Sequence, residues 1–298
     1  HNYIEKHIGQ LAFDYVWKIN DRGDKFSLNG RVRYDWYSLE YTESNLFELS
    51  GARWEGTRGY ESEHHWDSDA SANYELNYRE GGKMELGYQY TSKRLAVGVN
   101  LYYMQYRNQL IPTGMVNDSS DALNVNVPDS YRCGAELVAE YKIAKWLTVN
   151  GSVTVSRNKI RNYVDLLADS PTYGENLGDM TIAYSPDCIA SLGVDFHYKG
   201  FEALITPRYV SKQYLTNNQI EGLTLDSYCV TNLDLGYTLP LAESRSMRLG
   251  LCIYNLFNAK YCSNGYGYSY MWDGERYDEA YYFPQAPLHI LANVTVKF

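Results

Sequence analysis

The sequence predicts an all-β fold in which antiparallel strands form the wall of a transmembrane β-barrel. Three observations predict it. Apolar and polar residues alternate along most of the chain, short and long connections alternate between these segments, and aromatic residues make up 15% of the chain, with 31 tyrosines. Tyrosine combines an apolar ring with a polar hydroxyl, which suits membrane interfaces and polar ligand surfaces. No apolar run approaches the roughly 18 residues of a membrane-spanning helix, whereas a barrel strand needs only about 9–11 alternating residues.

The first two expected strands cover residues 11–19 and 26–36. One face of the first carries only apolar or aromatic side chains, namely Leu11, Phe13, Tyr15, Trp17 and Ile19. In the second, the polar positions all fall on the opposite face, at Ser27, Asn29, Arg31, Arg33 and Asp35. An outward Lys or Arg at mid-membrane costs roughly 2–4 kcal/mol, so the confinement of charge to one face is what a membrane barrel requires.

Later segments repeat the pattern at residues 95–103, 147–155 and 288–298. The second of these has a face of small hydroxyls and an amide, which suits the wall of a wet lumen better than a protein core. In the last, one apolar face runs to the terminal aromatic residue, with only Leu291 out of place. Such an ending is typical of the closing strand of a barrel in the outer membrane.

The connections predict the orientation of the strands. Short connections are expected at 20–25, 91–94, 143–145, 199–200 and 240–246, and long ones at 42–83, 111–123, 159–180, 215–225 and 257–287. Short turns face the periplasm and long loops face outward in outer-membrane barrels. The count gives about eleven strands, so we expect this chain to be part of a larger barrel. Two further short strands around Gly81-Gly82, at 74–76 and 84–86, would change that count.

Charge and cysteine content exclude several classes of function. The net charge is −9 with a pI near 5.2, and no block of Lys or Arg is present, so a nucleic acid partner is not expected. The five cysteines are odd in number and contain no C-x-x-C. We therefore expect free thiols rather than a disulfide framework or a zinc site, with a Cys252–Cys262 pair left open.

Several motifs, in order and at consistent spacing, resemble the TonB-dependent outer-membrane transporter family. The segment Asn255-Leu256-Phe257-Asn258-Ala259-Lys260-Tyr261 is similar to the family's "NLFNxxY" sequence, one strand before the terminus. Weaker similarities lie at 102–114, 130–132, 156–160, 211–215 and 282–287. The resemblance covers roughly residues 88–298.

The resemblance implies a 22-stranded barrel whose lumen holds an N-terminal plug, with energy supplied by the TonB complex through an N-terminal box. No segment here resembles the plug or the box, so residues 1–298 are expected to be the C-terminal half of the barrel. The expected function is active import of a scarce large solute: an iron–siderophore, haem, cobalamin or a glycan. Expected partners are outer-membrane lipid, the plug and remaining barrel, the TonB complex, the barrel insertion machinery and a surface lipoprotein.

Candidate substrate contacts gather in the long loop 264–282, where glycines and acids are expected to supply bends. They are Tyr266, Tyr268, Tyr270, Trp272, Tyr277, Tyr281 and Tyr282. Tyrosines at alternate positions would form one exposed aromatic face able to stack on a sugar, a catecholate or a macrocycle. The alternative is that these rings pack within the loop and at the membrane interface.

Other candidates are structural. Gln213, Tyr214 and Asn255 are candidates for contact between barrel and plug or for positions on the barrel rim, the alternative being ordinary hydrogen bonding at strand ends. Val294, Val296 and Phe298 are expected to form a signal read by the insertion machinery. His64, His65 and Asp67 are weak metal candidates, because adjacent histidines on a strand point apart and a solvated acidic loop is the better explanation.

Enzymatic chemistry finds no support in the sequence. The histidines are scattered and no G-x-S-x-G is present. We expect no enzyme activity and no cofactor. The alternatives to active import are a passive porin or ligand channel, and, with less support, a surface hydrolase, an adhesin or a soluble β-protein.

Overall fold

The computed structural model describes residues 2–18, 25–42, 47–49, 52–54, 58–59, 78–116, 122–165, 170, 172–241 and 245–297. Eleven strands of these ranges pair in one antiparallel wall, in the order β1-β2-β6-β7-β8-β9-β11-β12-β15-β16-β19. Their bounds are β1 Asn2–Lys18, β2 Lys25–Thr42, β6 Tyr78–Thr91, β7 Leu95–Val116, β8 Ala122–Ala144, β9 Leu147–Ile160, β11 Cys188–Tyr198, β12 Phe201–Val210, β15 Tyr228–Pro240, β16 Ser246–Tyr254 and β19 His289–Lys297. No helix in the described ranges is long and apolar enough to cross a membrane.

Eight further strands lie outside this path, six of them only two or three residues long. β5 (Arg58–Gly59) and β10 (Met180–Thr181) add to the wall beside β2 and β9. Three separate pairs are β3 (Phe47–Leu49) with β4 (Ala52–Trp54), β13 (Gln213–Tyr214) with β14 (Thr224–Leu225), and β17 (Cys262–Trp272) with β18 (Glu275–Pro284). The predicted all-β antiparallel architecture is therefore confirmed, with the expected eleven wall strands among the described residues.

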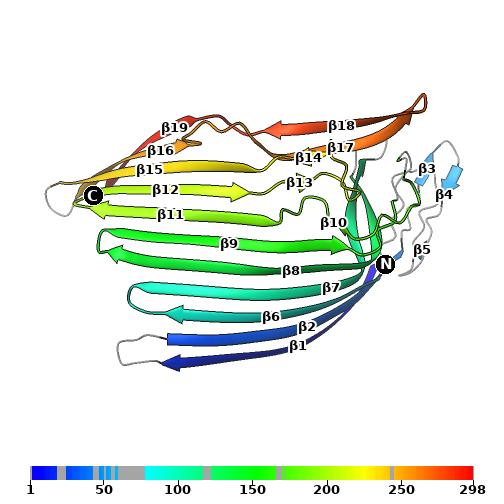
Figure 1. The fold of residues 1–298 in the computed structure, drawn as a ribbon, viewed down its shortest axis with the longest axis horizontal. Helices are drawn as coiled ribbons and strands as arrows, with labels where there is room; N and C mark the ends of the chain where they lie inside the picture. The colour runs from blue at the N-terminus through cyan, green and yellow to red at the C-terminus, as the bar shows by residue number, and fades with distance from the viewer. Residues whose placement is uncertain are drawn as a thin grey trace.

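The short and long connections lie at opposite ends of the wall, as the sequence predicts. Figure 1 shows the short turns at the end that holds the C-terminus, and the long connections, with the N-terminus, at the other. We call these the turn end and the loop end. β17 and β18 lie toward the loop end, beyond the last residues of β16 (Figure 1).

The strand register confirms that the wall has one apolar and one polar face. Leu137 of β8 lies opposite Val153 of β9, and Ala190 of β11 lies on the other side of Val153. Leu137 and Val153 are 44% and 38% exposed although they are central wall residues. An apolar surface of this extent on a soluble protein would be an anomaly, whereas on a membrane barrel it meets lipid.

The polar face carries charges that pair with one another. The Lys83 ammonium lies 2.9 Å from the Glu85 carboxylate within β6. The Arg248 guanidinium of β16 lies 3.0 Å from the Glu202 carboxylate of β12, reaching over β15, which lies between these strands. Basic side chains on this face of the described wall are thus partly neutralised by acidic neighbours.

Aromatic rings cluster at the turn end of the apolar face. The ring centroids of Trp17 and Phe26 are 4.9 Å apart, those of Phe26 and Tyr88 4.8 Å, and those of Trp146 and Phe196 5.4 Å. Rings with this placement form the aromatic girdle by which barrels meet a membrane interface.

The glycine pair Gly81-Gly82 lies within a strand, not at a break between two short ones. β6 runs from Tyr78 through both glycines to Thr91 and pairs with β2 on one side and β7 on the other. Pairing on both edges holds the glycines extended despite their conformational freedom. Residues 84–86 are therefore part of β6, while 74–76 lie outside the described residues.

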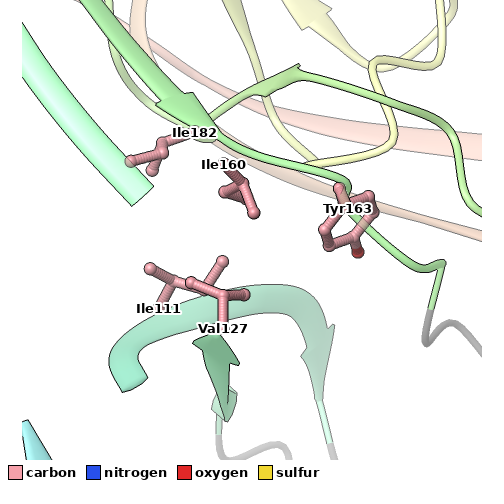
Figure 2. Packing of buried hydrophobic residues seen from close by; sticks show 5 residues of the cluster. All are labelled: Ile111, Val127, Ile160, Tyr163 and Ile182. Carbon is pink, nitrogen blue, oxygen red and sulfur yellow. The ribbon is translucent and has the colours of Figure 1, made fainter. Parts of the chain in front are cut away.

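The buried hydrophobic clusters lie at the loop end, in the outermost residues of wall strands and in the connections beyond them, which together we call the loop layer. Ile111, Val127, Ile160, Tyr163 and Ile182 are each at most 3% exposed and converge from β7, β8, β9 and the following loop (Figure 2). A second cluster contains Leu215, Ile220, Leu223 and Leu225. β17 also comes into contact with β7, a strand six positions away from β16 in the wall. The described part of the loop layer is therefore packed together.

All five cysteines are free. This agrees with the expectation of unpaired thiols and leaves no bond between Cys252 and Cys262.

Candidate functional site

The stretch expected to be an aromatic loop is a β-hairpin, β17–β18, that forms a sheet of its own. Its turn is Asp273-Gly274, where φ is 51° and 78°. Two successive residues with positive φ are what a two-residue type I′ turn requires. Gly265 and Gly267 lie in β17 instead of supplying bends, which corrects the sequence prediction. The tyrosines are therefore held at the regular spacing of a strand.

Six of the seven predicted contact residues share one face of the hairpin. Residues directly opposite each other in an antiparallel pair lie on the same face. The pairs are Tyr266 with Tyr281, Tyr268 with Glu279, Tyr270 with Tyr277, and Trp272 with Glu275. We call this set the aromatic face. Tyr282 is opposite Gly265 and lies on the other face.

The rings of the aromatic face stack along the hairpin. Tyr266 and Tyr281 are 5.0 Å apart at an interplanar angle of 10°, and Tyr270 and Tyr277 are 5.6 Å apart at 17°. Tyr268 joins the two pairs, at 6.1 Å from both Tyr281 and Tyr270. Offset stacking of this kind contributes about 0.5–1.5 kcal/mol per pair beyond burial. The face is a row of mutually supported rings.

One carboxylate binds three of the tyrosine hydroxyls. Glu279 accepts hydrogen bonds from Tyr281 at 2.8 Å, Tyr270 at 2.9 Å and Tyr268 at 3.0 Å. These three bonds, that from Tyr281 foremost, lower the pKa of Glu279 below its ordinary value. Hydrogen bonding with Tyr268 and then with Glu279 raises the pKa of Tyr281. The Tyr281 hydroxyl therefore remains a protonated donor at neutral pH.

The other face of the hairpin packs on the second buried cluster. A Cβ atom at Gly267 would lie 2.9 Å from a methyl carbon of Leu223, and one at Gly265 would lie 2.6 Å from the Tyr281 carbonyl oxygen. Leu223 and Leu215 are fully buried. The glycines are therefore required for close approach. The segment 213–225, which contains β13 and β14, is the platform that supports the hairpin.

Tyr184 fastens the platform to the hairpin, and sequence reasoning did not identify it. Its hydroxyl donates to the Gly265 carbonyl oxygen at 3.1 Å and its N–H donates to the Tyr214 carbonyl oxygen at 2.9 Å. Its φ is 56°, an unfavourable conformation for a bulky residue. Burial raises the pKa of its hydroxyl. No local sequence pattern marks this contact.

Gln213 and Tyr214 lie on the platform and not in the wall. They form β13, which pairs with β14. The Lys212 ammonium lies 5.2 Å from the Tyr214 ring centroid, within cation–π range. The pair is at the loop end, where a rim role was predicted, and its contact with a plug stays a prediction.

Asn255 organises the turn that follows β16. It is 3% exposed with φ of 51°. Its amide group donates to the carbonyl oxygens of Ala259 at 2.9 Å and Ala286 at 3.2 Å, and its side-chain oxygen accepts from the Ala259 N–H at 2.8 Å. These bonds join the turn to the segment that enters β19. The geometry matches the strand-end alternative, and a plug contact stays a prediction.

Tyr282 borders a cavity between the hairpin and this turn. The cavity has a volume of about 560 Å³, within the usual range for ligand pockets. Its lining includes Leu225, Asp226, Lys260, Tyr261, Tyr282 and Gln285. Tyr261 is held by stacking on Tyr228, with centroids 4.5 Å apart. The seventh predicted contact residue thus belongs to a second, adjoining concavity.

A buried carboxylate joins two loops, and no sequence pattern indicates this contact. Asp165 is fully buried and accepts hydrogen bonds from Ser170 and Thr172, both at 2.6 Å. Asn218 of the platform donates to the same oxygen at 3.4 Å. The loop after β9 and the platform are therefore joined through one polar contact.

Of the remaining predicted residues, two lie in the part of the chain that the structure describes and four lie outside it. Val294 and Val296 of β19 lie on the apolar face opposite Leu249 and Met247. Phe298 lies outside the described residues, as do His64, His65 and Asp67. Among the described residues no group of three or more His, Cys, Asp or Glu side chains is placed to hold a metal.

The wall and its loop layer define an outer-membrane barrel, and the comparisons specify which kind. Residues 81–256 match the family model described as TonB dependent receptor-like, beta-barrel. A search among curated protein sequences found no match. Because the family model matches more than half of the chain, the chain belongs to the TonB-dependent receptor family and is part of an outer-membrane β-barrel.

Solved structures of similar fold include three receptors. The ferric-catecholate import receptor Fiu from E. coli K12 has a TM-score of 0.57 at 16% identity over 99% of this chain and 45% of that chain. The siderophore receptor PiuA from Acinetobacter baumannii has a TM-score of 0.57 at 13% identity, over 99% of this chain and 44% of that chain. The ferric yersiniabactin uptake receptor FyuA from Yersinia pestis has a TM-score of 0.53 at 15% identity, over 100% of this chain and 46% of that chain. The chain thus spans about half the length of these structures, and at such identity the likeness concerns the fold alone.

Proposed function

We infer that this chain serves in TonB-dependent active import of a scarce large solute across the outer membrane. The observation that carries the proposal is the aromatic face, fixed by the platform above the loop end of a barrel wall of this family. Iron–siderophores, haem, cobalamin and glycans are the candidate solutes. Receptors of similar fold are described as importing ferric catecholate and ferric yersiniabactin, which supports import as the activity.

The proposed mechanism consists of binding and gating, without bond making. The exposed rings capture the solute, and movement of a plug, coupled to the TonB complex, opens the path through the lumen. The hairpin is suited to capture because its rings are already stacked, so little conformational entropy is lost on binding. The plug, the rest of the barrel and the TonB complex are the partners that this mechanism requires.

Uptake by cells that carry the intact protein tests the proposal. Labelled ferric tris-catecholate, haem, cobalamin and a malto-oligosaccharide represent the four solute classes. We expect accumulation of one class that stops in a strain without TonB and after addition of a protonophore. Uptake that persists without TonB would indicate a passive channel instead.

A hairpin variant shows whether the aromatic face is the point of capture. Tyr281→Ala with Trp272→Ala should raise the half-saturating solute concentration about tenfold or more, since each lost ring contact contributes about 0.5–1.5 kcal/mol. Tyr173→Ala is the matched control, because Tyr173 is 60% exposed on another loop. An equal effect of both variants would count against the aromatic face.

The C-terminal strand carries a separate proposal about assembly. Val294, Val296 and Phe298 are proposed as the signal that the barrel insertion machinery reads, because alternate positions of an edge strand present an apolar row. Deletion of Phe298 should lower the amount of folded barrel on heat-modifiability gels, while Lys297→Gln should leave it unchanged. Full yield after the deletion would contradict this role. A surface lipoprotein partner remains part of the proposal, to be tested by co-purification.

A further inference from the structure

We propose that the aromatic face captures an uncharged, elongated, polyhydroxylated ligand, an oligosaccharide, and not an anionic iron chelate. The inference rests on the proposed function of the hairpin as a capture surface. It is drawn from the charge, the ring arrangement and the length of that surface. It also differs from the ligands named for the receptors of similar fold, whose likeness to this chain concerns the fold alone.

The charge of the hairpin opposes an anion. Residues 262–284 contain four acids, Asp273, Glu275, Asp278 and Glu279, and one base, Arg276. That base is already bound, with the Arg276 Nε 2.7 Å from an Asp278 oxygen. The negative electrostatic potential of these acids slows the approach of an anion and weakens its binding. An uncharged ligand is not penalised.

Two basic groups of the surrounding loops are paired with acids. The Arg161 guanidinium lies 3.3 Å from Asp129, and the Lys212 ammonium lies 3.2 Å from Glu221. Both pairs are partly exposed, so each offers an acid beside its base. Neither pair offers the concentrated positive charge that recognises carboxylates and catecholates.

The rings form a row, which argues against a cationic ligand. A cation–π site needs open ring faces around one position, within about 6 Å of each centroid. Here Tyr266 covers Tyr281 and Tyr270 covers Tyr277 at interplanar angles of 10° and 17°. The neighbouring faces are used by the rings themselves, and no cage for an ammonium group is present among these stacked rings.

The length of the row fits an extended ligand. Tyr266 and Trp272 are six residues apart on one strand, a span of about 20 Å at about 3.3 Å per residue. Trp272 at the tip is 70% exposed, and Tyr277 and Tyr281 are 40% and 44% exposed. A linear ligand can contact the whole row, whereas a compact chelate reaches only part of it.

The polar groups of the face match sugar hydroxyls. Glu275 and Asp273 are exposed at the tip beside Trp272 and accept hydrogen bonds, which sugar hydroxyls donate. The C–H faces of a pyranose ring are apolar and can pack on the Trp272 indole, which is 70% exposed, and against the exposed edges of the stacked tyrosines. Aromatic rings alternating with carboxylate acceptors therefore suit a chain of sugar rings.

Calorimetry on the intact detergent-solubilised protein tests the inference. The probes are maltohexaose as a neutral oligosaccharide, ferric tris-catecholate and ferric citrate as anions, and choline as a cation. We expect binding of maltohexaose alone. Trp272→Ala should weaken it about tenfold, and the control Tyr173→Ala should leave it unchanged.

A charge-neutralising variant separates failure of this inference from failure of the proposed function. Asp273→Asn with Glu275→Gln should weaken maltohexaose binding several-fold and should not create binding of either anion. If a ferric anion binds wild-type protein, loses affinity with Trp272→Ala and gains it with the neutralised variant, the ligand class is wrong and the capture role stands. Absence of maltohexaose binding also overturns the ligand class. If every probe that binds is unaffected by Trp272→Ala, the capture role fails as well.

Discussion

The hairpin β17–β18 lies in the chain between the two paired wall strands β16 and β19. Both pairs are antiparallel and both have alternating side chains, yet the faces that result differ in polarity. In β16–β19, Leu249, Leu251 and Ile253 lie opposite Val294, Ala292 and Ile290 and form a face that needs no polar partner. In β17–β18 the face is mostly tyrosine, and three of its hydroxyls bind Glu279. The first face is suited to lipid and the second to water and a solute.

Both strand pairs have the same period-two pattern, so the pattern alone does not determine whether a face meets lipid or water. The presence or absence of a polar group at the end of each side chain does. Aliphatic side chains can face hydrocarbon without a partner, whereas a hydroxyl deprived of water and of a hydrogen-bond acceptor costs free energy. The hairpin places a carboxylate within reach of its hydroxyls and so would be expensive to move into a membrane. Three predictions test this contrast.

The largest expected effect is on the attachment of the hairpin to its platform. Leu223→Ala removes a fully buried side chain that contacts Gly267, and should lower the free energy of hairpin opening by about 2–5 kcal/mol. Faster hydrogen exchange in residues 262–284, with the wall unaffected, is the expected measurement. Leu137→Ala, on the lipid face, is the control. Unchanged exchange in the hairpin would show that it is held by other contacts.

A somewhat smaller effect is expected for charge on the wall. Val153→Arg puts a guanidinium on the apolar face at mid-strand and should destabilise the folded barrel in vesicles by about 2–4 kcal/mol. Thr154→Arg is the matched control, since Thr154 lies on the polar face opposite Glu136. Denaturant unfolding of both variants measures the difference, and equal losses would contradict the assignment of the faces.

The smallest expected effect concerns pH. The pKa of Glu279 is lowered in the folded hairpin, so its ionised form is favoured there and its contribution to stability is present at neutral pH. That contribution should be lost as pH falls below the ordinary carboxyl range. We expect the near-ultraviolet circular dichroism of wild type and of Glu279→Gln to differ at pH 7 and to converge as the pH falls below the ordinary carboxyl range. Spectra that differ by the same amount at every pH would contradict the role of Glu279.

The wall could be predicted from the sequence because its information is local. A strand with one face toward lipid needs only period-two alternation and a turn at each end, and both are visible in residues 95–103 and 147–155. The site was predicted less completely. The aromatic residues were identified, but Gly265 and Gly267 were interpreted as bends because the leucines that pack on them are about 40 residues away. Tyr184 and Asp165 act through contacts between loops, which no local pattern records.

The platform under the hairpin has a consequence for exchanging binding surfaces between receptors. Gly265 and Gly267 fit closely against three leucines of the platform, Leu215, Leu223 and Leu225. The hairpin, residues 262–284, would therefore not pack in the same way on the loops of another receptor. The smallest transplantable unit is the hairpin with residues 211–227 and Tyr184. A chimera that carries all three segments should bind the donor's solute, and one that carries the hairpin alone should fold its barrel yet bind nothing.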